Sequence, residues 1–111
     1  MGKTGKDSGD GNAPARLLVV GAGVAGQSLV REIQQNGFPV EPIAFLDDDP
    51  QLLNQVVCGL PVLGGSDDLE KVARETGADE VLLAIPSSGG RLVRRLVIRC
   101  KRAGLPFRLV P

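Results

Sequence analysis

The stretch LLVVGAGVAG, from Leu17 to Gly26, decides the fold. Four apolar residues closed by a glycine are typical of a strand buried in a parallel sheet. Apolar residues then recur at helical spacing over 24–36, and Asn36-Gly37 supplies a helix stop. A GxGxxG match alone is weak, but a strand before it and a helix after it predict a turn that holds the phosphates of a nucleotide.

Each glycine of this turn has its own expected task. Gly21 permits the tight turn out of the strand, Gly23 lets the backbone approach a pyrophosphate, and Gly26 allows the helix to pack closely on the strand. The amides that open the helix, at Val24 and Ala25, are expected to face the anion. The phosphates would then need no basic side chain.

The rest of the chain alternates strands and helices. The pattern predicts further strands over 40–46, 59–64, 79–85 and 106–110, and further helices over 66–76 and 88–103. Pro42 weakens the 40–46 strand because proline has no N–H for the ladder, and Ser66 or Asp67 can cap the helix that follows. The alternation predicts one α/β, Rossmann-like domain: a parallel five-stranded sheet in the order 3-2-1-4-5, with helices on both faces.

Asp47 is the first candidate contact outside the glycine turn. It follows Gly26 by about 20 positions, at the end of the second strand, where a ribose-binding carboxylate belongs. A carboxylate there would accept hydrogen bonds from ribose hydroxyls and repel a 2′-phosphate, which favours NAD over NADP. Asp48 beside it is grouped with the same site. The alternative is that 47–49 form only a polar turn before Pro50.

A second group of candidates follows the 79–85 strand, at the topological switch point of the expected sheet. Pro86, Ser87 and Ser88 lie there, and either serine can hydrogen-bond a phosphate or the distal ribose. The alternative for Ser88 is a helix N-cap, and the two roles can coexist. Arg91 is the cation nearest the phosphate end. The many cations of the 88–103 helix are more typical of a solvated face than of a contact with an acidic domain or an anionic membrane.

Composition limits the domain organisation, the partners and the location that can be expected of the chain. The chain has 111 residues, 42% of them apolar, with 13 basic and 13 acidic residues. Residues 1–15 are predicted to be a disordered tail or a remnant of the expression vector, and 16–111 the folded domain. The balanced charge gives no reason to expect nucleic acid as a partner. No apolar run is long enough to cross a bilayer and no signal peptide is evident, so the chain as given is expected to be soluble and cytoplasmic.

The chemistry that the chain lacks is equally informative. It contains no histidine and no tyrosine, and its two cysteines, Cys58 and Cys100, have no CxxC spacing. A zinc site, a disulfide framework and a self-sufficient catalytic constellation are therefore not expected. We expect no catalytic residue, no metal ligand and no turnover from this chain alone.

Five blocks in a fixed order carry a resemblance. They read VVGAGVAGQSLVREI, AFLDDDP, GLPVLGGSDDL, ADEVLLAIPS and GLPFRLVP, and together they cover nearly all of 16–111. They resemble the N-terminal cytoplasmic nucleotide-binding domain of bacterial polysaccharide-biosynthesis nucleoside-diphosphate-sugar epimerases and dehydratases. The segment 51–57 departs from that pattern, since it lacks the usual glycine and basic residues.

The resemblance implies a parent protein larger than this chain. In that family membrane-spanning helices precede the domain, and a catalytic short-chain-dehydrogenase domain with its own NAD(P) follows it. This places the parent on the cytoplasmic face of the inner membrane, where it would make capsule or O-antigen. The blocks are also similar to a domain of polyprenyl-phosphate sugar-phosphate transferases, and an oligomerising scaffold with an empty site is a third alternative. NAD is the favoured ligand, with a UDP-sugar or coenzyme A left open, and a homo-oligomer is possible.

Overall fold

The computed structural model describes residues 13–110, and the predicted tail lies largely outside them. The first strand begins at Ala15, one residue before the predicted boundary at Arg16. The elements in chain order are β1 (Ala15–Val20), α1 (Val24–Asn36), β2 (Val40–Leu46), β3 (Val56–Val57), β4 (Leu60–Pro61), η2 (Ser66–Asp68), α2 (Leu69–Thr76), β5 (Glu80–Leu83), η3 (Ser87–Gly89), α3 (Gly90–Ala103) and β6 (Phe107–Leu109). Within residues 13–110 no helix is long and apolar enough to span a bilayer.

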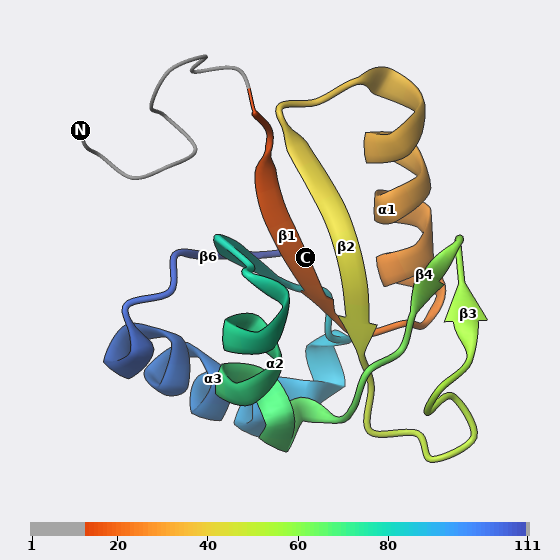
Figure 1. Ribbon diagram of the computed structural model, residues 1–111. Coiled ribbons are helices and arrows are strands. Elements are labelled where there is room, and N and C mark those ends of the chain that lie inside the picture. Colours follow the sequence, from red (N-terminus) through yellow and green to blue (C-terminus); the bar gives the residue numbers. More distant parts are fainter. Residues whose placement is uncertain (1–12, 111) are drawn as a thin grey trace, which may run out of the picture.

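Four strands form one parallel sheet in the order β2-β1-β5-β6. This is the α/β fold with a parallel sheet that the sequence predicts. The helix α1 lies on one face of the sheet, and α2 and α3 lie on the other (Figure 1). All three helices end at a glycine with left-handed backbone, at Gly37, Gly77 and Gly104, as expected for helix C-termini.

The predicted third strand, over 59–64, is wrong as a member of the sheet. Cys58 and Gly59 both have positive φ, 53° and 78°, which gives the tight turn of a β-hairpin. The chain therefore folds back on itself, and β3 pairs with β4 in a separate antiparallel ribbon. The residues after this ribbon lie along β2: Val62 forms an isolated parallel bridge with Phe45, and the Leu63 amide donates to the Phe45 carbonyl at 3.0 Å. The five-stranded order is thus reduced to four strands and a bridge.

The second strand tolerates Pro42 by an irregularity in its pairing. The register of β1 against β2 shifts between Leu17 and Leu18, so that Leu17 faces Pro42 and Leu18 faces Ala44. Ile43 is skipped, as in a β-bulge. The strand then continues in regular register to Leu46, and its carboxyl end lies at the candidate site.

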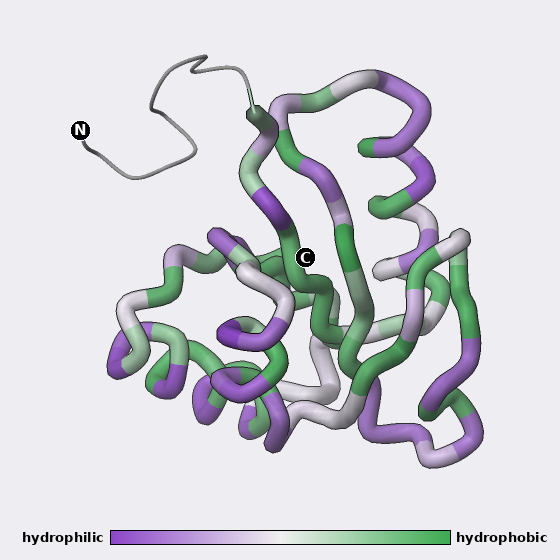
Figure 2. The backbone as a smooth tube through the Cα atoms, in the orientation of Figure 1, coloured by the Kyte–Doolittle hydropathy of each residue, from purple (hydrophilic) through white to green (hydrophobic). Residues whose placement is uncertain are grey.

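Side chains of the central strands alternate between two apolar clusters. On one face Leu17, Val19 and Phe45 pack with Val30 of α1. On the other face the intervening Leu18 and Val20 pack with residues of α2 and α3, including Leu69, Leu96 and Cys100. Figure 2 shows the same distribution, with apolar residues along the strands and polar ones on the outer turns of the helices. A sheet that is buried on both faces leaves the ends of its strands as the place for a ligand.

Arg99, a member of the basic α3 series, ties α3 to α2. Its guanidinium donates to the carboxylate of Glu70 and to the Asp67 carbonyl oxygen, the latter at 2.7 Å. The Arg99 side chain is 21% exposed, so at this position the helix does not present the solvated face that its many cations favour. Its hydrogen bonds hold the pKa of Glu70 below the ordinary value of 4.5.

We expect this pair to make stability depend on acid pH. A carboxyl whose pKa is lowered by folding stabilises the folded state above its unfolded pKa and loses that contribution as the pH falls through its folded pKa. Stability should therefore decline less below about pH 4.5 in Glu70→Gln than in the native chain. The pair is partly exposed, so its contribution at pH 7 should not exceed about 1 kcal/mol. Urea titrations between pH 3 and pH 7 measure it, and parallel curves for both proteins would contradict this role.

Candidate functional site

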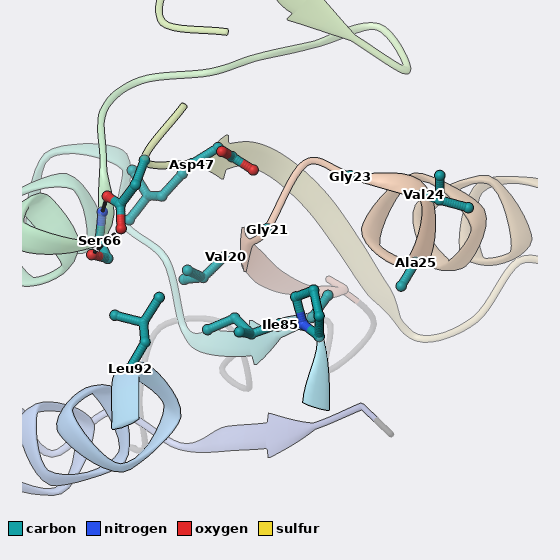
Figure 3. A pocket seen from close by; sticks show the side chains of 13 residues that line it. Val20, Gly21, Gly23, Val24, Ala25, Asp47, Ser66, Ile85 and Leu92 are labelled. Carbon is teal, nitrogen blue, oxygen red and sulfur yellow. Dashed lines mark hydrogen bonds between the residues drawn. The ribbon is translucent and has the colours of Figure 1, made fainter. Parts of the chain in front are cut away.

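The carboxyl ends of β1, β2 and β5 meet at a cavity of about 320 Å³. Figure 3 shows Asp47 and Ser66 on one side of it, Ile85 and Leu92 on another, and the turn from Gly21 to Ala25 beside them. Its lining consists of Val20, Gly21, Gly23, Val24, Ala25, Leu46, Asp47, Asp48, Ser66, Ala84, Ile85, Pro86 and Leu92. The volume lies at the small end of the range for ligand pockets, roughly 300–1,000 Å³.

Two glycines of the turn are required by close backbone contacts. Gly21 has a φ of 110°, and a Cβ there would overlap the carbonyl oxygen of Ala84. A Cβ on Gly26 would overlap the carbonyl oxygen of Gly21 itself. Gly26 is buried beneath the turn and does not line the cavity, so it shapes the site without reaching a ligand.

Gly23 differs from both, since a Cβ there would meet no atom within 4 Å. It is the N-cap of α1, with an extended backbone and no side-chain cap. The first amide to bond within the helix is that of Gln27, which donates to the Gly23 carbonyl at 2.9 Å. The amides of residues 24–26 precede that bond, and Val24 and Ala25 line the cavity. Uncapped amides at a helix start offer a place for an anion.

Asp47 is held against the glycine turn by two backbone amides. Its Oδ2 accepts from the Ala22 amide at 2.8 Å, and its Oδ1 accepts from the Asp49 amide at 2.9 Å. The carboxylate is half-buried and lines the cavity. Each oxygen retains a lone pair, so a ribose hydroxyl can still donate to it. The polar-turn alternative and the ribose alternative are therefore compatible in this geometry.

The Asp48 carboxylate is held by Ser66, a residue that the sequence predicts only as a possible helix cap. Its Oδ1 accepts from the Ser66 amide at 2.7 Å, and its Oδ2 accepts from the Ser66 hydroxyl at 2.8 Å. Ser66 is 3% exposed, and it caps no helix through its side chain. The sequence signal for this contact is the Gly64-Gly65 pair that precedes Ser66. A Cβ on Gly65 would meet Asp48 Oδ1, so a glycine is needed for the close approach. Two fixed carboxylates thus form one wall of the cavity.

The candidates after β5 divide between two sites. Pro86 lines the cavity, whereas Ser87 lines a separate groove beside it. Ser88 and Arg91 line neither, both are exposed, and Ser88 makes no side-chain cap for η3 or α3. The expected N-cap role of Ser88 is therefore wrong, because the chain enters α3 through a 3-10 turn rather than at Ser88. Sequence reasoning also missed the apolar part of the lining, which comprises Val20, Leu46, Ala84, Ile85 and Leu92.

The position of Asp47 leads to a prediction for binding. Asp47→Asn should weaken NAD binding by about 1–3 kcal/mol, because an asparagine amide cannot accept as a charged carboxylate does. It should also lessen the preference for NAD over NADP, since the charge that repels a 2′-phosphate is gone. Titration calorimetry with both cofactors measures these changes.

Asp49→Asn is the matched control. Asp49 is exposed, and its Oδ1 accepts only from the Gln51 amide, at 2.9 Å, a bond that asparagine preserves. The assignment fails if the Asp49 variant loses affinity while the Asp47 variant keeps both its affinity and its preference for NAD.

Comparison with known proteins gives matches over most of the chain. The profile of the CoA-binding domain family matches residues 8–111. The probable polysaccharide biosynthesis protein EpsC of Bacillus subtilis (strain 168) is 31% identical over 100 residues, which are 89% of this chain and 17% of that protein. The chain therefore spans about a sixth of the length of this relative.

Solved structures agree with the fold. The structure of UDP-D-quinovosamine 4-dehydrogenase from Vibrio fischeri superposes with a TM-score of 0.79 at 27% identity, covering 89% of this chain and 80% of that one. RSP in complex with β-NADH superposes with a TM-score of 0.70 at 16% identity, covering 88% of this chain and 54% of that one, and another structure describes RSP as a Rex-family repressor. The second match is a likeness of fold alone.

The sheet, the glycine turn and the cavity define a Rossmann-like nucleotide-binding domain of the kind found in nucleoside-diphosphate-sugar enzymes. The chain belongs to the CoA-binding domain family. The cavity suits the diphosphate that coenzyme A shares with other nucleotides, through the amides of the turn. The described lining contains Asp47 and Asp48 but no lysine or arginine, so it offers no cationic side chain to the 3′-phosphate of coenzyme A.

Proposed function

We propose that the chain binds a nucleotide at the 21–26 turn and acts as the regulatory or structural nucleotide-binding domain of a larger enzyme of polysaccharide biosynthesis, one that acts on nucleoside-diphosphate sugars. The polysaccharide-biosynthesis relative and the dehydrogenase structure support the pathway. As implied by the resemblance, the parent is a dehydratase or epimerase anchored at the cytoplasmic face of the membrane, with a short-chain-dehydrogenase domain as partner.

One observation carries the nucleotide proposal. At Gly23 the chain leaves open space over the uncapped start of α1, while Gly21 and Gly26 on either side are tightly packed. A glycine that no protein atom requires, placed at a helix N-terminus in a cavity, is explained by a ligand that approaches the backbone there. The Asp47 carboxylate at the end of β2 then accounts for a ribose, which favours NAD among the candidate ligands.

The cavity is suited to binding rather than to chemistry. Asp47 and Asp48 are the ionisable side chains among the described residues that line it. Both are acceptors held by hydrogen bonds. The Ser66 hydroxyl donates to Asp48, but Ser66 is 3% exposed and the chain has no histidine that could activate it as a nucleophile. In the proposal these residues bind and orient the nucleotide, and the reaction on the sugar takes place in a separate domain of the parent.

A ligand panel tests the proposal. A ligand that binds only the folded state raises its stability, by about 2.7 kcal/mol at a hundredfold excess over Kd. We expect NAD to raise the melting temperature of the chain more than NADP or coenzyme A, with UDP and UDP-N-acetylglucosamine as the remaining members. If no nucleotide shifts the transition at millimolar concentration, the site is empty and the domain is a scaffold.

A further inference from the structure

The positive charge of the chain is concentrated on α3. The 14 residues of this helix hold six of the 13 basic residues and none of the 13 acidic ones. The rest of the chain therefore holds seven basic residues against 13 acidic ones, although the chain as a whole is neutral. An anionic surface orients a molecule whose charge is separated in this way, with α3 turned toward that surface.

The outer face of α3 is cationic with an apolar centre. The helix buries Leu96 and Cys100 against the sheet. Successive residues lie about 100° apart around an α-helix, so Ile98 comes near the middle of the opposite face. Ile98 is 50% exposed. Exposed cations lie on both sides of it: Arg91, Arg94, Arg95, Lys101 and Arg102.

The cations of this outer face are largely unpaired. Arg95 approaches Asp67 only at 3.9 Å, and both side chains are exposed. The other four form no ion pair among residues 13–110: Arg91, Arg94, Lys101 and Arg102. Four guanidinium or ammonium groups on one face are thus available to an external anion.

We propose that the outer face of α3 docks on an anionic phospholipid surface. Its cations meet the lipid phosphates, and Ile98 enters the boundary between the head groups and the acyl chains. This inference goes beyond the proposed function and takes from it only that the parent protein lies near a membrane.

The shape and composition of α3 favour a lipid surface over a nucleic acid. The helix α2 lies beside α3 on the same face of the sheet (Figure 1), so the two present a broad surface rather than one projecting helix that could enter a groove. Residues 90–103 include no asparagine or glutamine to pair with adenine and no aromatic ring to stack on a base. An aliphatic side chain such as Ile98 gains nothing from a phosphate backbone, whereas it gains from transfer into an apolar layer.

Vesicle sedimentation of the full chain, without nucleotide, tests the docking. We expect binding to phosphatidylcholine vesicles that contain about one third phosphatidylglycerol, and none to phosphatidylcholine alone. Salt at about 0.5 M should release the chain, because the Debye length falls to about 4 Å. Equal binding to both kinds of vesicle, or to neither, would overturn the proposal.

Matched arginine variants locate the charged part of the surface. Arg94→Gln and Arg102→Gln, on opposite sides of Ile98, should each lower the partition coefficient about fivefold, the effect of one cation near an anionic membrane. Arg31→Gln is the control, because it removes the same charge from an exposed position of α1, on the other face of the sheet. Equal losses from Arg31→Gln and Arg94→Gln would contradict the docking, since net charge rather than position would then decide binding.

Serine variants test the apolar centre. Ile98→Ser should lower the partition coefficient about fivefold, the gain from burying the exposed half of this side chain. Val56→Ser removes a 71% exposed side chain from β3 and should bind like the native chain. A DNA duplex serves as the competing polyanion. If Ile98→Ser binds vesicles like the native chain while the α3 arginine variants weaken vesicles and duplex alike, the face is a general polyanion site and the lipid proposal is wrong.

These outcomes are independent of the nucleotide site. No nucleotide is present in the sedimentation, so a chain that fails to bind vesicles can still bind NAD in the ligand panel. A chain that docks on vesicles but binds no nucleotide would leave this inference standing and remove the proposed function.

Discussion

Gly23→Val should weaken nucleotide binding at least a hundredfold and lower the free energy of unfolding by no more than about 1 kcal/mol, the order of the N-cap preference for glycine over valine. The backbone at Gly23 has φ −83° and ψ −163°, which valine adopts without strain. A Cβ there meets no protein atom within 4 Å. The branched side chain would instead fill the space over the amides of Val24 and Ala25, which a phosphate must reach.

Two comparisons make this result specific. Gly23→Ala adds one methyl group in the same place and should give a smaller loss of affinity. Ser28→Val puts the same valine side chain on an exposed position of α1 that does not line the cavity, and it should bind like the native chain. Calorimetry and urea unfolding measure the two quantities. Undiminished binding by Gly23→Val in a folded protein would remove the glycine turn from the site.

Local sequence signals predicted most of the architecture. The predicted helix over 24–36 matches α1, and the pairing of the first, second, fourth and fifth predicted strands matches the sheet. Local sequence determines these elements, because each is an apolar or amphipathic run, and glycines such as Gly37 and Gly104 mark where the helices end. Each stop is a left-handed glycine, which nearby sequence specifies without help from the rest of the fold.

The third strand failed because two kinds of turn compete in the same segment. Gly59 was read as a boundary, whereas with Cys58 it forms the tight turn of a hairpin. Cys58 is a non-glycine residue with positive φ, which sequence patterns rarely reveal. Its Sγ lies 3.8 Å from the Gln27 carbonyl oxygen of α1, so a tertiary contact accompanies this conformation. Only Val62 to Gly64 remain free to lie beside β2.

The sequence predicted the site residues whose positions follow from backbone spacing. It missed those that tertiary packing brings to the cavity. Gly21, Gly23 and Asp47 come together because a turn and two adjacent strand ends must meet in a parallel sheet. The link between Asp48 and Ser66 joins residues 18 positions apart, and only the approach of 62–64 to β2 brings them together. Ser88 and Arg91 were expected at the cavity from their nearness in sequence to Pro86. They lie outside it because η3 and the first turn of α3 carry them past the end of β5.

Gly26→Ala should lower the free energy of unfolding by about 3 kcal/mol or more, the upper range for forcing a methyl group into a packed interior. The added Cβ would overlap the carbonyl oxygen of Gly21, and backbone cannot yield as a side chain does. Either α1 moves away from β1 or the turn opens. For a domain of this size the melting temperature should fall by roughly 12 °C or more. Gly23→Ala, the same change three residues earlier in open space, should leave stability nearly unchanged. Equal melting temperatures for the two variants would mean that α1 does not pack on the turn as closely as described, and the shape of the nucleotide cavity would be wrong with it.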